Sequence, residues 1–251
     1  IMRPGFVNGK TYIKEITEVL KLQHWDKGRL NLFSGFCEDD TKNRKYLSLK
    51  NRAPWMTIAI SKAEQVKGCK EGNEPMYTLA KSYLKYCGNT FEPTDSYNGP
   101  WCAAFMNWCI GQTICPSTKK IYDHSKSASS LAPIDAVLGL NYKKIETPIF
   151  GCIVVYKHIS EWKGHTGFLF GKTEGGEYIL LGGNQNDTIR FDSYGEYTSS
   201  TKTKKIYGFY IPKDYEPTEE DKLNASDIYK NAEEVNTKYK IVSSASTGKT
   251  N

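Results

Sequence analysis

Gly99-Pro-Trp-Cys-Ala-Ala-Phe-Met-Asn-Trp-Cys109 is the most informative segment of this 251-residue chain. Pro100 is favoured at the start of a helix, because the N–H group that proline lacks has no helical partner there. We therefore expect a helix over residues 101–110 with Cys102 in its first turn. The segment is apolar on nearly all sides, which predicts that this helix is buried.

The patterns on the two sides of this segment differ. Two further helices are predicted before it, over residues 55–66 and 77–86, where apolar residues recur at helical spacing. Apolar runs after it predict strands over residues 152–156, 166–170, 178–181 and 206–211. Short, Gly-rich connections favour antiparallel hairpins. The expected fold is α+β, with the N-terminal helices packed on an antiparallel β-sheet.

The composition divides the chain into three parts. Residues 1–50 are expected to form an N-terminal accessory segment of unknown function, with one amphipathic helix over residues 12–22. The α+β domain is expected over residues 51–214. Residues 215–251 are charged and poor in apolar residues, so we predict a largely disordered C-terminal tail.

The charge and the cysteine pattern of the chain indicate which classes of partner and cofactor to expect. The 34 Lys and Arg residues exceed the 28 Asp and Glu residues by only six and form no cluster typical of a nucleic-acid site, so no nucleic-acid partner is expected. No apolar run is long enough for a transmembrane helix, and no signal peptide is visible. The seven cysteines show no zinc-ligand spacing, and no metal or organic cofactor is predicted.

Cys102 is the candidate nucleophile. The start of a helix carries partial positive charge and free N–H groups, which stabilise a thiolate and lower the pKa of the thiol. The same N–H groups can hold an oxyanion during acyl transfer. The alternative is a structural cysteine, because free cysteines are often buried.

His165 is the candidate base, since a thiol nucleophile needs a base within hydrogen-bond reach. It lies between two glycines at the start of a predicted strand, whereas His158, the alternative, ends the preceding strand. A third group must orient the imidazole. Antiparallel pairing is expected to bring Asn184 beside His165, with Asp187 as its rival; the alternative is that both belong only to a turn.

Four segments together resemble the CHAP-type cysteine amidohydrolases/peptidases and their NlpC-type relatives: PWCAAFMNWC, GCIVVYK, GHTGF and LLGGNQND. The resemblance covers about residues 54–212 and looks nearest to a phage and bacterial branch that shares PWCAAF and GGNQ. It implies a papain-like fold in which Cys102 is the nucleophile, His165 the base and Asn184 the orienting residue. Typical members carry a Glu two residues before the position of Asn184, where this chain has Gly182.

That resemblance implies a cysteine amidase or endopeptidase that hydrolyses amide bonds of bacterial peptidoglycan. Such a protein would act in the periplasm or cell wall, as a phage-type lysin or as an antibacterial effector that is secreted or delivered into target cells. Its partners would be peptidoglycan and a cognate immunity protein or a component of a secretion apparatus. A protein-modifying deamidase or acyltransferase and a non-catalytic wall-binding module remain as alternatives.

Overall fold

A seven-stranded sheet is the centre of residues 51–198 and 202–241, the part of the chain that this computed structural model describes. Its strands are β1 (Tyr142–Ile145), β2 (Ile153–His158), β3 (Gly164–Thr173), β4 (Tyr178–Gln185), β5 (Thr188–Tyr194), β6 (Lys204–Pro212) and β7 (Ile228–Tyr229). The order is β1-β6-β2-β3-β4-β5, and all these pairs are antiparallel. Only the short β7 pairs in parallel, beside the end of β3.

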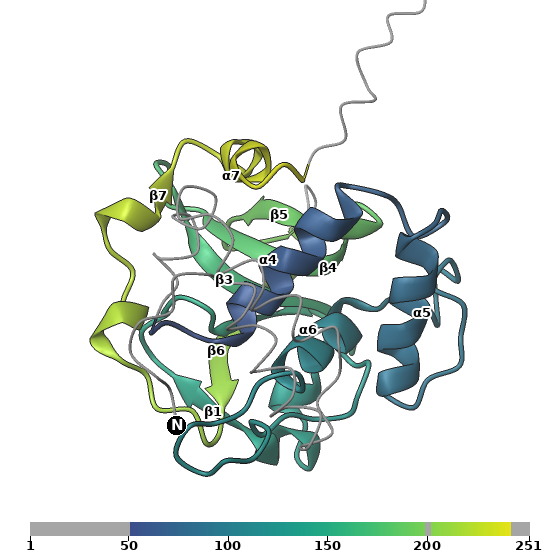
Figure 1. The fold of residues 1–251 in the computed structure, drawn as a ribbon, viewed down its shortest axis with the longest axis horizontal. Helices are drawn as coiled ribbons and strands as arrows, with labels where there is room; N and C mark the ends of the chain where they lie inside the picture. Colours follow the sequence, from purple (N-terminus) through teal and green to yellow (C-terminus); the bar gives the residue numbers. More distant parts are fainter. Residues whose placement is uncertain (1–50, 199–201, 242–251) are drawn as a thin grey trace, which may run out of the picture. The chain divides into compact units, whose positions relative to one another are not determined.

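Four α-helices accompany this sheet in the described residues: α4 (Trp55–Val66), α5 (Met76–Tyr86), α6 (Cys102–Ile110) and α7 (Ala232–Lys238). Short 3-10 turns lie at η1 (Ala132–Ile134), η2 (Leu138–Asn141), η3 (Glu219–Asp221) and η4 (Ala225–Asp227). Helix α6 packs on β3 and β4, α4 packs on α6 and β5, and α7 packs on β5 (Figure 1). The prediction of an α+β fold with helices and an antiparallel sheet is confirmed.

The contact between α6 and β4 depends on a glycine. A Cβ atom at Gly183 would lie 2.5 Å from the Trp101 ring and 2.8 Å from the Phe105 Cβ. Real Cβ atoms do not approach other atoms so closely, so only glycine lets the start of α6 reach the strand. This close contact with β4 therefore determines how near to the sheet Cys102, the residue after Trp101, lies.

The prediction of a disordered tail is wrong for residues 215–241. These residues form η3, η4, β7 and α7, and Asp227 makes a buried ion pair with Arg52. The two guanidinium nitrogens lie 2.8 and 3.0 Å from the two carboxylate oxygens, and both side chains are about 5% exposed. Asp221 accepts a hydrogen bond of 2.9 Å from the Ala53 N–H.

Helix α7 adds a second attachment, because the Asn236 side chain pairs with both backbone groups of Phe191 in β5, at 3.0 and 2.9 Å. Composition was misleading here. Two carboxylates of this charged segment, Asp221 and Asp227, are buried hydrogen-bond acceptors, and the apolar residues that follow them, such as Val235, Tyr239 and Ile241, are buried as well.

Residues 1–50 and 242–251, for which we predict an accessory segment and the end of the tail, lie outside the described residues. The six cysteines of the described part are all free thiols. In that same part, no helix combines the length and the apolar character needed to cross a bilayer.

Candidate functional site

Cys102 is the first residue of α6 and is 5% exposed. Burial raises the pKa of its thiol; the backbone N–H groups of Thr166 and Ala103 and the charge of Lys204 act in the opposite direction. The helix N-terminus was expected to lower this pKa, but the desolvation of a buried thiolate outweighs it. The free protein therefore holds Cys102 as a neutral thiol.

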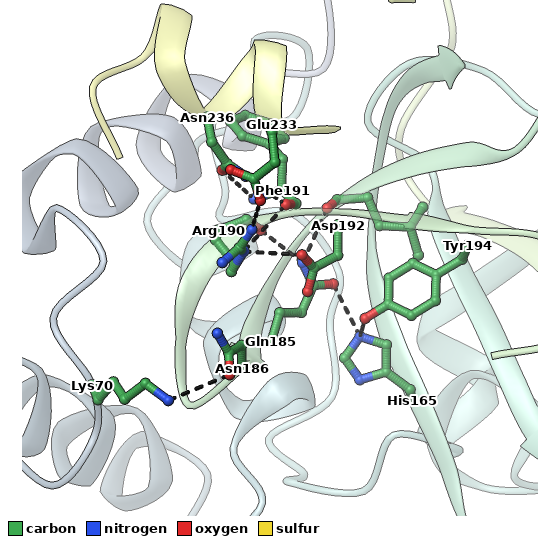
Figure 2. A network of polar contacts seen from close by, with 11 residues as sticks. Lys70, His165, Gln185, Asn186, Arg190, Phe191, Asp192, Tyr194, Glu233 and Asn236 are labelled. Atoms are coloured by element: carbon green, nitrogen blue, oxygen red, sulfur yellow. Dashed lines mark hydrogen bonds and ion pairs between the residues drawn. The ribbon is translucent and has the colours of Figure 1, made fainter. Parts of the chain in front are cut away.

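His165 lies on β3 next to two polar side chains of β4 and β5. Its Nε2 atom is 3.1 Å from Oε1 of Gln185 and 3.4 Å from the hydroxyl of Tyr194 (Figure 2). Burial lowers the pKa of His165 to about 4, and the nearby charge of Lys204 also lowers it, whereas the bond to Gln185 raises it. His165 is therefore neutral at physiological pH.

The hydrogen bonds of Gln185 determine which nitrogen of His165 carries the proton. The Gln185 amide nitrogen donates to the carbonyl oxygens of Leu180 and Arg190, at 3.1 and 2.7 Å. Carbonyls only accept, so the amide oxygen must be the atom that faces His165, and His165 must donate from Nε2. A neutral imidazole carries one N–H, which leaves Nδ1 as an unprotonated acceptor.

A β-bulge explains why Gln185, and not the predicted Asn184, contacts His165. The β4–β5 pairing shifts by one residue between Gly182 and Gln185, and Asn184 adopts a left-handed conformation with φ 54°. The extra residue reverses the alternation of faces, so the Gln185 side chain covers Gly182, where a Cβ would lie 2.6 Å from Oε1 of Gln185. The pattern GGNQ contained this residue, but strand alternation alone does not reveal the bulge.

The other candidates are not hydrogen-bonded to His165. Asn184 is half-buried and its side chain bonds to no other described residue. Asp187 lies in the exposed β4–β5 turn, 3.3 Å from the ammonium of Lys70. His158, at the end of β2, lies 3.9 Å from Glu161.

Cys102 and His165 share two neighbours, Thr166 and Tyr194. The backbone N–H that acts on the Cys102 sulfur belongs to Thr166, the residue after His165. The Tyr194 hydroxyl contacts His165, and negative charge on Cys102 raises the pKa of that same tyrosine. A thiol at a helix start and a neutral imidazole thus lie near the same two residues, and these groups are suited to acyl transfer.

Among the described residues, no group of three or more His, Cys, Asp or Glu side chains is placed to hold a metal ion. No model of a protein family matches the chain. No curated protein matches it, and no solved structure does.

Proposed function

We propose that this protein is a papain-like cysteine hydrolase that cuts amide bonds of bacterial peptidoglycan, as an amidase or an endopeptidase. One observation carries the enzymatic part of the proposal. The thiol of Cys102, at the start of a buried helix, lies against the backbone of the residue that follows His165. A cysteine with only a structural role has no need of a neighbouring imidazole whose tautomer is fixed.

The proposed reaction starts from the neutral pair. Nδ1 of His165 accepts the proton of Cys102 while the sulfur attacks the amide carbonyl. Backbone N–H groups at the start of α6 stabilise the resulting oxyanion. The imidazolium then protonates the leaving amine, an acyl-enzyme remains, and water activated by His165 releases the acid and the free thiol.

Burial of both groups explains why the proton moves during the attack and not before it. A thiolate–imidazolium pair formed before the attack would place two charges in a desolvated site. Desolvation disfavours both charges, because it raises the pKa of Cys102 and lowers the pKa of His165. Gln185 has the role first given to Asn184: its amide oxygen holds the ring through Nε2–H and partly stabilises the imidazolium.

Peptidoglycan as the substrate rests on the resemblance of four sequence segments to CHAP-type and NlpC-type hydrolases. The net charge of +6 is compatible with an anionic polymer. This substrate places the activity in the periplasm or cell wall, in an antibacterial effector or a phage-type lysin. An effector of this kind needs a cognate immunity protein in the cell that makes it.

Mass spectrometry of purified peptidoglycan after digestion tests the proposal and names the bond. We expect new amide-cleavage products with the wild-type chain and none with Cys102→Ala, which keeps the fold because alanine suits the first turn of a helix. Cys69→Ala is the matched control, since this half-buried thiol lies outside the site, and it should digest normally. Activity of Cys102→Ala within tenfold of wild type would remove Cys102 as nucleophile. Cys102-dependent modification of proteins without any wall product would favour a deamidase or acyltransferase.

A further inference from the structure

Lys204, the first residue of β6, is on the same face of the sheet as His165. Residues directly opposite each other in an antiparallel pair share a face, as do residues two apart in a strand. His165 is opposite Tyr156 of β2, and Lys204 is opposite His158 of the same strand. Because Tyr156 and His158 are two residues apart, all four side chains leave the sheet on one side.

The ammonium group of Lys204 has no anionic partner in the part of the chain that the structure describes. Lys204 is half-buried, and none of the ion pairs found among residues 51–198 and 202–241 includes it. Its charge nevertheless reaches the site, since it lowers the pKa of both Cys102 and His165. A half-buried cation beside two neutral groups leaves local positive charge that an anion can balance.

We propose that Lys204 binds a substrate carboxylate next to the scissile amide, so that the enzyme selects stem peptides with a free carboxylate at that position over the amidated form. This inference rests on the proposed hydrolase function and specifies its substrate. Stem peptides of peptidoglycan carry such carboxylates. Lysine recognises a carboxylate as a point charge, and the neutral carboxamide lacks that charge.

The neighbouring lysine provides a matched control. Lys205 is opposite Lys157, one residue along the strand, so its side chain leaves the sheet on the face away from His165. It is exposed and has the same charge as Lys204. A change at Lys205 therefore alters net charge by the same amount without changing the charge above the site.

The experiment uses two synthetic peptides that span the bond identified by digestion of peptidoglycan. They differ only in a carboxylate or a carboxamide at the position nearest the scissile amide. We expect the wild-type chain to show a kcat/KM about 10- to 100-fold higher for the carboxylate, as for a hydrogen bond to a charged group. Lys204→Gln should bring the ratio close to one, mainly through KM; Lys204→Arg should keep the preference, and Lys205→Gln should leave it as in wild type.

The outcomes separate this inference from the proposed function. A wild-type chain that cleaves neither peptide nor peptidoglycan contradicts the hydrolase itself. A wild-type chain that cleaves both peptides equally well keeps the hydrolase and overturns the role of Lys204. An equal loss on both peptides in Lys204→Gln also overturns it, because the lysine would then act on Cys102 and His165 and not on the carboxylate.

Discussion

Gln185 is the residue on which the state of His165 depends. Two backbone carbonyls fix its amide, the amide fixes the Nε2 proton of His165, and that proton leaves Nδ1 free to act as a base. Figure 2 shows that these contacts continue from Arg190 to Glu233 of α7 and from the neighbouring Phe191 to Asn236 of α7. Contacts with the sheet and with the C-terminal segment thus both hold the residues of the candidate site in position.

Replacing Gln185 tests this chain of contacts. We expect Gln185→Ala to lower kcat by about 100-fold with little change in KM, because the imidazole loses its orientation and not its contact with substrate. Gln185→Glu should recover part of this loss, since a carboxylate also accepts from Nε2–H. NMR titration should place the pKa of His165 near 4 in the wild type and higher in Gln185→Glu, because the negative charge favours imidazolium.

Asn184 provides the control for that prediction. Asn184→Gly removes the side chain and keeps the left-handed backbone without strain, so kcat should stay close to that of wild type. If Asn184→Gly is more damaging than Gln185→Ala, the sequence-based assignment is right and the orienting role of Gln185 is refuted. The positions of Cys102 at a helix start and of His165 at a strand start were predictable, because helix starts and Gly-flanked strand starts are local signals. The third residue was not, because it depends on a bulge.

At the scale of elements, Gly183 controls how closely α6 approaches the sheet. A methyl group there has no room between Trp101 and Phe105, so Gly183→Ala should lower the free energy of unfolding by about 1–3 kcal/mol, as overpacked cores do. Urea unfolding measures this effect. Gly175→Ala is the control: its nearest contact would be 3.6 Å away, and its effect should stay below about 0.5 kcal/mol. Equal effects of the two changes would contradict the proposed tight contact.

The elements also show which parts of the fold are readable from sequence. The helix predicted over residues 55–66 matches α4, and the next one starts one residue later than α5. Strand β5 was missed, although Ile189 and Phe191 are buried in alternation with more exposed neighbours, because the run NQND before it indicated only a turn. The sequence indicated at most one weak helix near residues 225–235, which overlaps the start of α7, and β7 was missed, because the stability of both elements comes largely from tertiary contacts.

At the scale of the whole domain, contacts join the start of the described residues, at Arg52, to the C-terminal segment, residues 215–241. A chain that stops after Asp214 leaves Arg52 buried without Asp227, and an uncompensated buried charge costs about 3–5 kcal/mol. It also uncovers Phe170 and Phe191, which pack against the ring of Tyr239. These losses are comparable with the whole stability of a domain, about 5–15 kcal/mol.

We therefore expect the chain that stops after Asp214 to lose cooperative thermal unfolding and its near-ultraviolet circular dichroism. The chain that stops after Ile241 is the control, since it keeps every described contact of the segment and should melt as the full chain does. A shorter chain that melts cooperatively near the wild-type temperature would show that residues 215–241 are dispensable for folding.

The ion pair between Arg52 and Asp227, 175 positions apart, also sets the order of events during protein synthesis. Cys102, His165 and Gln185 all leave the ribosome before Asp227 has been translated. Closing so long a loop is slow, and the residues it joins cannot pair until the later one emerges. The nascent chain consequently carries all three candidate site residues before a folded domain aligns them, and the hydrolytic activity that we propose would begin only after translation has passed α7.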